Sequence, residues 1–176
     1  MENKIIIAGF GGQGVQSLGM FIAFASIHDG KEVTFLPSYG PEMRGGTSNC
    51  SVVVSDKPVA SPIIARPDIL IAMNKPSLAK FEPKVKPGGC IIVNSSLIED
   101  KVKRTDVDVY YVDANKLALD AGNAKTANIV VLGAYTKISG VFTPEVMKAV
   151  IEHKFAKKPK VIPANFKAFD LGYALD

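Results

Sequence analysis

Residues 4–14 read Lys-Ile-Ile-Ile-Ala-Gly-Phe-Gly-Gly-Gln-Gly, a short apolar strand that runs into a glycine-rich turn. A helical pattern of apolar residues follows at positions 15–25. Gly9, Gly11 and Gly14 have the spacing G-x-G-x-x-G, which allows a tight turn, brings backbone N–H groups close to an anion and directs a helix N-terminus toward it. Strand, turn and helix together predict a phosphate-binding unit at the start of an α/β domain.

The same glycine spacing also occurs in first βα units that bind nothing, so a purely structural turn stays open as an alternative. A nicotinamide-binding domain would place Asp or Glu at the end of the second strand, about 20 residues further on, to hold the ribose hydroxyls. The second apolar run, residues 32–36, has its only acid, Glu32, at its start. A nucleotide-binding P-loop would need a Lys-Ser or Lys-Thr pair directly after the glycines, and none follows there. The pattern therefore predicts a diphosphate cradle and disfavours NAD.

Strand-like and helix-like segments alternate along the rest of the chain. β-branched residues predict a third strand at residues 48–54, which could run antiparallel, and the apolar run at residues 67–73 is typical of a parallel strand buried on both faces. Further strands are expected at residues 90–94 and 107–113, and helices at residues 76–81, 115–122, 126–139, after Thr143, and at 165–175. This alternation predicts an α/β fold with a Rossmann-like, doubly wound, mostly parallel sheet and helices on both faces.

The length and composition set the domain organisation. A chain of 176 residues with 47% hydrophobic residues can bury one core of ordinary size, so we expect a single domain over residues 1–176, in which residues 157–176 form a connector and a C-terminal helix. No apolar run approaches the roughly 20 residues that span a bilayer, and the N-terminus lacks the features of a signal peptide. These features predict a cytoplasmic protein. Cys50 and Cys90 are far apart and lack Cys-x-x-Cys spacing, so we expect buried, reduced thiols and no metal or iron–sulfur site within the chain.

The formal net charge of +4 does not point to nucleic acid or to catalysis. The excess cations lie in turns and tails, no helix carries a basic stripe, and no aromatic residues alternate with the cations, so we interpret the charge as solvated surface with a mild preference for anionic ligands. His28 and His153 lie near the ends of predicted helices, where the helix dipole favours a cation. No other residue is a credible nucleophile or general base, so no catalytic residue is expected in this chain.

A second loop, residues 39–47, reads Tyr-Gly-Pro-Glu-Met-Arg-Gly-Gly-Thr and carries more chemistry than a plain connector needs. Arg44 can bind a phosphate or carboxylate through its two-pronged donor, and Glu42 could hold it in position beside Gly45 and Gly46. A salt bridge that only stiffens the turn, or a contact to another subunit, is the alternative interpretation. Because this loop follows the second strand, we expect it at the same edge of the sheet as the glycine turn.

Both loops together resemble the gamma subunit of 2-oxoacid:ferredoxin oxidoreductases. The similarity covers almost the whole chain, including residues 67–74 and the helix at residues 128–140 with its Gly133-Ala134 pair. The Pro-Glu-Met-Arg-Gly-Gly form of the second loop is more similar to the 2-oxoglutarate and 2-oxoisovalerate members than to the pyruvate members.

The resemblance implies a subunit of a complex that decarboxylates a 2-oxoacid, passes electrons to ferredoxin and transfers the acyl group to coenzyme A (CoA). It places thiamine diphosphate, magnesium (Mg) and the 4Fe-4S clusters in partner subunits named alpha, beta and possibly delta. The gamma chain is then concerned with CoA binding and closure of the active site, and is inactive alone. Two rival hypotheses stay open: a docking subunit that binds no ligand, and a stand-alone nucleotide-binding oxidoreductase.

The candidate CoA-binding residues come from both loops and from the first turn of the first helix. Backbone N–H groups of the glycine turn would receive the diphosphate, Arg44 would add a charge-assisted contact, and Gln13 or Ser17 would supply a side-chain donor. Their role would be to position the thiol arm rather than to transfer protons. The full set is Gly9, Gly11, Gly12, Gln13, Gly14, Ser17, Glu42, Arg44, Gly45 and Gly46.

Overall fold

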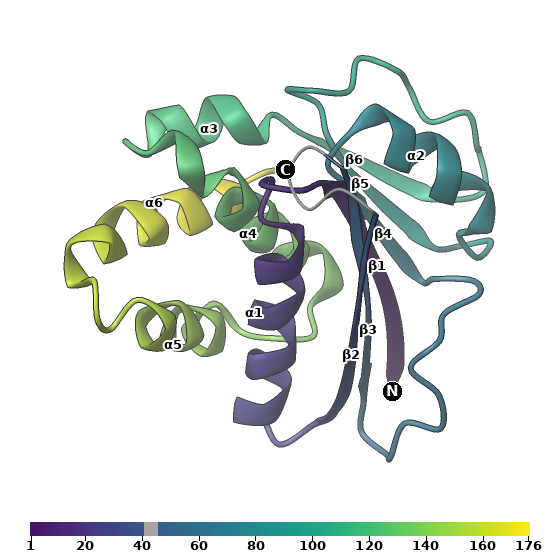
Figure 1. Cartoon of the computed structure of the whole chain (residues 1–176), viewed down its shortest axis with the longest axis horizontal. Helices are drawn as coiled ribbons and strands as arrows, with labels where there is room; N and C mark the ends of the chain where they lie inside the picture. Colours follow the sequence, from purple (N-terminus) through teal and green to yellow (C-terminus); the bar gives the residue numbers. More distant parts are fainter. Residues whose placement is uncertain (41–45) are drawn as a thin grey trace.

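In the computed structural model, six strands form one mixed sheet with the order β2-β3-β1-β4-β5-β6 (Figure 1). The structure describes residues 1–40 and 46–176. The strands are β1 (Glu2–Phe10), β2 (Glu32–Tyr39), β3 (Thr47–Ser55), β4 (Ile69–Ala72), β5 (Cys90–Asn94) and β6 (Asp108–Val112). The helices are α1 (Val15–His28), α2 (Lys75–Phe81), α3 (Ala114–Asp120), α4 (Ala127–Ser139), α5 (Pro144–Lys154) and α6 (Ile162–Tyr173), with the short 3-10 turns η1 (Glu82–Lys84), η2 (Ala124–Thr126) and η3 (Pro159–Val161).

The pairing of the strands confirms the expected mostly parallel sheet. β1, β4, β5 and β6 run parallel to one another, and β3 pairs antiparallel with β1 on one side and with β2 on the other. The predicted third strand is therefore antiparallel, and it separates β2 from β1. β2 also continues three residues beyond the predicted Leu36, through Pro37, because an edge strand tolerates a residue that cannot donate to the ladder.

Helices cover both faces of the sheet, as predicted. α1, α4, α5 and α6 lie on one face and α2 lies on the other (Figure 1). β4 is buried along its whole length, as expected for a parallel strand between two layers. Since the helices after β1 and β4 leave toward opposite faces, the boundary between these strands is the switch point at which open α/β sheets bind ligands.

Close packing of α4 against α6 depends on two glycines. A β-carbon on Gly133 would collide with the carbonyl oxygen of Phe169, and one on Gly172 would collide with that of Val130. The sequence-based expectation that the Gly133-Ala134 pair permits close packing is confirmed. α6 begins three residues earlier than expected, because Pro163 occupies its first turn, where a missing N–H costs no hydrogen bond.

The predicted N-terminus of α5 is also confirmed. Thr143 accepts a hydrogen bond at Oγ1 from the N–H of Val146, at 3.3 Å, and Pro144 is the first helical residue. Across residues 1–40 and 46–176, no helix combines the length and the apolar character that crossing a bilayer requires.

Candidate anion-binding cleft

The glycine turn after β1 has a backbone that side chains would disturb. Gly12 and Gly14 have φ values of 93° and 74°, in the region that favours glycine. A β-carbon on Gly9 would lie 2.8 Å from Cβ of Met73. These glycines therefore shape the turn itself, in addition to any role in binding.

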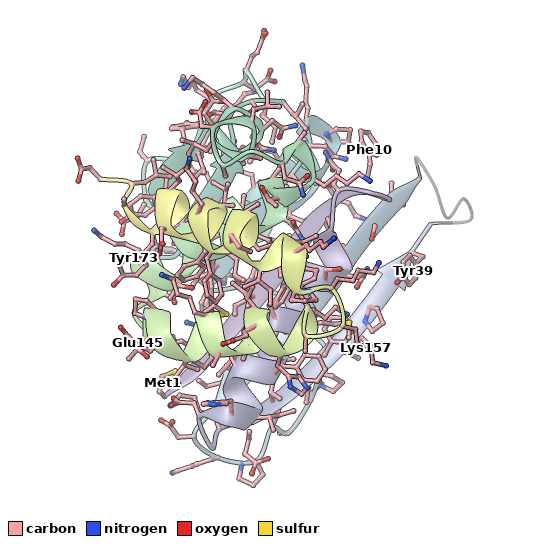
Figure 2. The ribbon with its side chains drawn as sticks, turned by 90° about the vertical axis from the view of Figure 1, so that its left-hand side faces the viewer. Met1, Phe10, Tyr39, Glu145, Lys157 and Tyr173 are labelled. Carbon is pink, nitrogen blue, oxygen red and sulfur yellow. The ribbon has the colours of Figure 1, made fainter. Side chains whose placement is uncertain are left out.

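The second loop ends beside this turn, as the sequence predicted. The N–H of Gly11 donates to the carbonyl oxygen of Gly46 at 2.8 Å, and Phe10 is paired with Thr47 in the β1–β3 ladder. Figure 2 shows Phe10 and Tyr39, at the ends of β1 and β2, on the same side of the molecule. The predicted site residues Glu42, Arg44 and Gly45 lie outside the described residues.

The side chain of Gln13 ties the turn to the chain that follows β4. Its Oε1 accepts a hydrogen bond from the N–H of Phe10 at 2.6 Å, and its Nε2 donates to the carbonyl oxygen of Met73 at 3.1 Å. The side chain predicted to donate to a ligand thus also fixes the position of the turn across the β1–β4 boundary.

The N–H groups near the turn fall into two sets. Those of Gly11 and Gln13 are used internally, in bonds to Gly46 and Phe10. Those of Gly12, Gly14 and residues 15–17 have no acceptor among the described residues, and Gly14 caps α1 without a side chain that could compete for them. The second set, at the positive end of α1, is the one available to an anion.

A cleft of about 490 Å³ lies against this end of α1. Four of the predicted site residues line it: Gly12, Gln13, Gly14 and Ser17. The opposite wall comes from the carboxyl end of β5 and from the segment that leads into α4. The cleft therefore occupies the predicted position at the carboxyl ends of the parallel strands. Gly9, Gly11 and Gly46 support the turn but do not line the cleft.

The opposite wall contains residues that the sequence did not single out as a site. Lys125 is an exposed cation in η2, and Asn128 in the first turn of α4 donates from Nδ2 to the carbonyl oxygen of Gly14 at 3.4 Å. Asn94, which is buried, donates from Nδ2 to Oδ1 of Asn115 at 2.9 Å. The polar end of the predicted strand at 90–94 was a signal for Asn94, but Lys125 and Asn128 follow no recognisable motif.

The cleft can therefore attract negative charge from two directions. The N-terminus of α1 and the N-terminus of α4 both border it, each with the positive end of a helix dipole, and Lys125 adds a full charge. Asn94, Asn115 and Asn128 supply neutral amide groups beside them. This arrangement suits a ligand with phosphate groups and a polar body.

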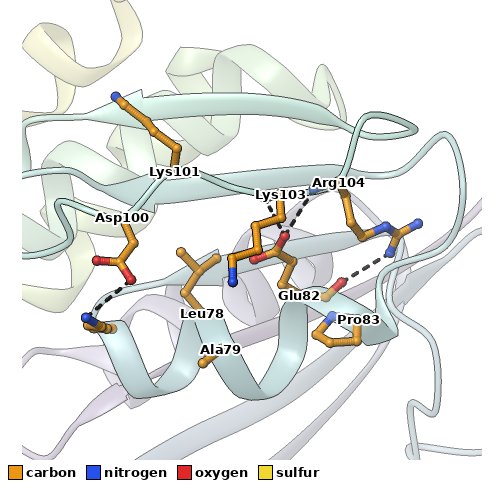
Figure 3. A pocket seen from close by; sticks show the side chains of 9 residues that line it. Leu78, Ala79, Glu82, Pro83, Asp100, Lys101, Lys103 and Arg104 are labelled. Carbon is orange, nitrogen blue, oxygen red and sulfur yellow. Dashed lines mark hydrogen bonds and ion pairs between the residues drawn. The ribbon is translucent and has the colours of Figure 1, made fainter.

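A second cleft, of about 570 Å³, lies between α2 and residues 100–104 on the other face of the sheet (Figure 3). Its charges are mostly paired within the protein. Nζ of Lys75 lies 3.3 Å from Oδ2 of Asp100. Oε1 of Glu82 accepts hydrogen bonds from the backbone N–H groups of Lys103 and Arg104. Arg104 binds carbonyl oxygens and Asp106. These contacts fasten residues 100–104 onto α2 and the η1 turn that follows it.

The thiols differ in burial. Cys50 is fully buried, as predicted, and burial raises its pKa to about 12. Cys90 is only partly buried, and desolvation followed by the charge of Asp108 raises its pKa to about 12. Both are free thiols, and among the described residues no three His, Cys, Asp or Glu side chains gather as metal ligands.

Comparison with known proteins gives a consistent result. The family model of pyruvate ferredoxin/flavodoxin oxidoreductase matches residues 4–175. Ketoisovalerate oxidoreductase subunit VorA of Methanothermobacter marburgensis is 38% identical over 97% of this chain and 36% of its own length. 2-Oxoglutarate synthase subunit KorC of Methanocaldococcus jannaschii is 35% identical over 98% of this chain and 93% of its own length. The chain thus spans about a third of the VorA relatives but nearly all of KorC.

Solved structures agree with the sequence relatives. The gamma subunit of a keto/oxoacid ferredoxin oxidoreductase from Geobacter sulfurreducens superposes with a TM-score of 0.87, at 31% identity, over 98% of this chain and 95% of that one. A 2-oxoglutarate:ferredoxin oxidoreductase from Magnetococcus marinus, solved with 2-oxoglutarate, coenzyme A and succinyl-CoA, superposes with a TM-score of 0.89, at 28% identity, over 98% of this chain and 30% of that one. The match over residues 4–175 shows that the chain belongs to the pyruvate ferredoxin/flavodoxin oxidoreductase family.

Proposed function

We propose that this chain is the gamma subunit of a cytoplasmic 2-oxoacid:ferredoxin oxidoreductase that forms acyl-CoA, and that its cleft binds CoA. The observation that carries the CoA assignment is the meeting of two helix N-termini and Lys125 at one cleft of about 490 Å³. The family membership, the name of the KorC relative and the CoA in the Magnetococcus marinus enzyme support it. 2-Oxoglutarate, or a related 2-oxoacid such as 2-oxoisovalerate, is the proposed substrate of the whole complex.

The chemistry of CoA matches the two sides of the cleft. Its diphosphate would accept hydrogen bonds from the unpaired N–H groups of Gly12, Gly14 and the first turn of α1. Lys125 and the start of α4 would attract further negative charge, and Arg44 stays a predicted additional contact. The amides of Asn94 and Asn115 would face polar atoms of the ligand. Holding the carrier in this way places its thiol near the acyl intermediate, which is a contribution of proximity rather than of acid–base catalysis.

The reaction itself would take place on partner chains. In this proposal the alpha and beta subunits and, where present, a delta subunit hold thiamine diphosphate, magnesium and the iron–sulfur clusters, and ferredoxin accepts the electrons. The candidate cleft contributes amides, hydroxyl groups and one cation, which bind and orient a ligand but do not cleave a carbon–carbon bond.

The sheet order argues against the rival hypothesis of a stand-alone dinucleotide enzyme. In dinucleotide-binding domains the acid that holds the ribose lies at the end of the strand next to the glycine turn. Here β3 lies between β1 and β2, and it runs in the opposite direction, so β2 does not adjoin the turn. β2 also ends in Tyr39 rather than in an acid.

The docking hypothesis retains one observation in its favour. The N–H groups of Gly11 and Gln13 are bonded within the protein, so part of the glycine turn serves the fold and not a ligand. A subunit that only docks would need this shape without any CoA contact.

Kinetics of the assembled complex separate the two hypotheses. Lys125→Ala should raise the Michaelis constant for CoA about tenfold, because a charge-assisted hydrogen bond at an exposed site contributes about 1.5 kcal/mol. The Michaelis constant for the oxoacid should stay unchanged. Lys160→Ala removes an exposed lysine from η3 and is the matched control. Arg44→Ala tests the predicted contact from the second loop in the same assay. If both Lys125→Ala and Arg44→Ala leave the Michaelis constant for CoA unaltered, CoA does not bind in this cleft and the docking hypothesis is favoured.

A further inference from the structure

The outer face of α1 is apolar, and no element of the described residues fully covers its Phe24 and Ile27. Apart from His28 at its end, the helix contains no ionisable side chain, and helices that are apolar all round are typical of buried positions. Its inner face, including Leu18 and Ile22, is fully buried. On the outer face, Phe24 is 47% exposed and Ile27 is 63% exposed. α1 therefore has the composition of a buried helix but is open to solvent along one side.

α5 forms the other side of a groove along this open face. The groove has a volume of about 660 Å³, and Met20, Phe24 and Ile27 of α1 line it opposite Ala149 and Val150 of α5. Met20, Phe24 and Ile27 are spaced by four and three residues, so they form one ridge along the helix. A groove between two helices with such a ridge has the shape that receives a third, amphipathic helix.

The ionisable residues that line the groove are basic ones. His28, His153 and Lys154 lie at the ends of the two helices, and among the described residues that line the groove there is no carboxylate. Figure 2 shows α5 with Glu145 near its first turn and Lys157 beyond its last turn, so the basic residues continue past the helix end. Lys154 has no ion-pair partner among the described residues. The groove thus combines an apolar floor with a basic end.

We infer that this groove is the docking site for an amphipathic helix of a sister subunit, with an apolar ridge over Phe24 and Ile27 and carboxylates beside His153 and Lys154. A second copy of this chain fits less well, because its own groove offers no carboxylate to meet Lys154. The match covers only 36% of the VorA relatives, so these longer chains contain polypeptide beyond the region that is similar to this one. The inference rests on the proposed membership of a multi-subunit complex.

Photo-crosslinking in the assembled complex tests the occupant directly. Phe24 is replaced by p-benzoylphenylalanine, the complex is irradiated, and the linked peptides are identified by mass spectrometry. A link to a helix of a sister subunit with Asp or Glu near the contact is the expected result. A link to a second copy of this chain, or no link in a complex that has assembled, overturns the inference. Failure of the chain to assemble with any oxidoreductase subunit would instead overturn the proposed function.

Charge and hydrophobic variants give an independent measurement. Phe24→Glu and Ile27→Glu should each weaken assembly at least about tenfold, as is usual when an apolar anchor is lost from the centre of an interface. Leu119→Glu introduces the same change at a leucine of α3 that is 65% exposed and lies outside the groove, so it is the matched control. Lys154→Glu should weaken assembly more than Lys167→Glu, which changes an exposed lysine of α6. Native mass spectrometry measures assembly, and circular dichroism of each isolated variant checks that it is folded. Equal assembly of Phe24→Glu and Leu119→Glu would rule the groove out.

Discussion

Gly12 and Gly14 both have a positive φ, but their surroundings differ. Replacing each by alanine should therefore lower the free energy of unfolding by different amounts. A β-carbon on Gly12 meets no atom of residues 1–40 or 46–176 within 4 Å, whereas one on Gly14 would lie 2.7 Å from Cγ of Asn128. Gly12→Ala should therefore cost only backbone strain, about 1 kcal/mol, and Gly14→Ala about 2–3 kcal/mol, because Asn128 must also move. Urea denaturation of both variants gives the two free energies. Equal losses would show that Asn128 is not packed against the turn as described.

The Cys50 thiol predicts how stability depends on alkaline pH. Burial raises its pKa from the ordinary value of 9.0 to about 12 in the folded state. Below pH 9.0 both the folded and unfolded thiol are protonated and its contribution to stability is complete. As the pH rises from 9.0 toward 12, the unfolded thiol ionises while the folded thiol keeps its proton, so stability is lost, by at most about 1.4 kcal/mol per pH unit.

The test compares the free energy of unfolding at several pH values above neutrality for wild type and Cys50→Ala. The variant should be less stable at neutral pH, because it leaves a small cavity beneath α1, and should lose stability less steeply in alkali. If the free energy of unfolding falls equally steeply with pH in both proteins, burial does not raise the pKa of the Cys50 thiol.

At the level of elements, the contact between α4 and α6 leaves no room for an added methyl group at its glycines. Gly172→Ala would place a methyl group against the carbonyl of Val130, so the helices must separate and the variant should lose about 3 kcal/mol or more. Gly122→Ala is the comparison, because Gly122 has a φ of 95° but open space around it, so only about 1 kcal/mol of strain is expected. Thermal and urea unfolding of both variants measure the difference. A small loss for Gly172→Ala would show that the helices are further apart than the structure describes.

Most elements could be predicted because their signals are local. Thr143 and Pro144 mark the start of α5, and the apolar run at residues 69–72 has the pattern of a strand buried on both faces. The two boundaries that differ by three residues both involve proline. Pro37 lies within β2 and Pro163 within the first turn of α6, where an edge strand and a helix start tolerate it. A proline ends a strand or helix only where its missing N–H would have to donate a hydrogen bond. Whether it must do so depends on the position of the element in the tertiary structure.

At the scale of the whole molecule, the chain should be inactive until it is assembled. Purified alone, it should oxidise no 2-oxoacid, and it should restore CoA-dependent ferredoxin reduction when added to alpha and beta subunits that lack it. The physical reason is that, in the proposed function, the groups lining the cleft hold and orient CoA while the oxoacid reacts on partner chains. Spectrophotometric assay of ferredoxin reduction with and without the chain checks this. Turnover by the isolated chain would contradict both the proposed function and the non-catalytic character of the cleft.

Half of the candidate cleft could be predicted and half could not. Residues 12–17 could be predicted because the glycine turn and the helix that follows it match a known anion-binding pattern. Lys125 and Asn128 face them from more than 100 positions away in the chain, as the hydrogen bond from Asn128 to Gly14 demonstrates. No local pattern marks these two residues as a site, since their chemistry depends on where α4 begins relative to α1.

Backbone preferences and apolar periodicity, read residue by residue, were sufficient to establish the α/β class, the glycine turn and the order of the elements. The two loop motifs carried the resemblance to the oxidoreductase family. The insertion of β3 between β1 and β2, the second helix N-terminus at the cleft and the uncovered side of α1 became visible only once the chain was folded. Conformational preferences act over a few neighbouring residues, so they can be read from the sequence. Which distant segments come together depends on how all the elements pack at once, and no local sequence pattern specifies that packing.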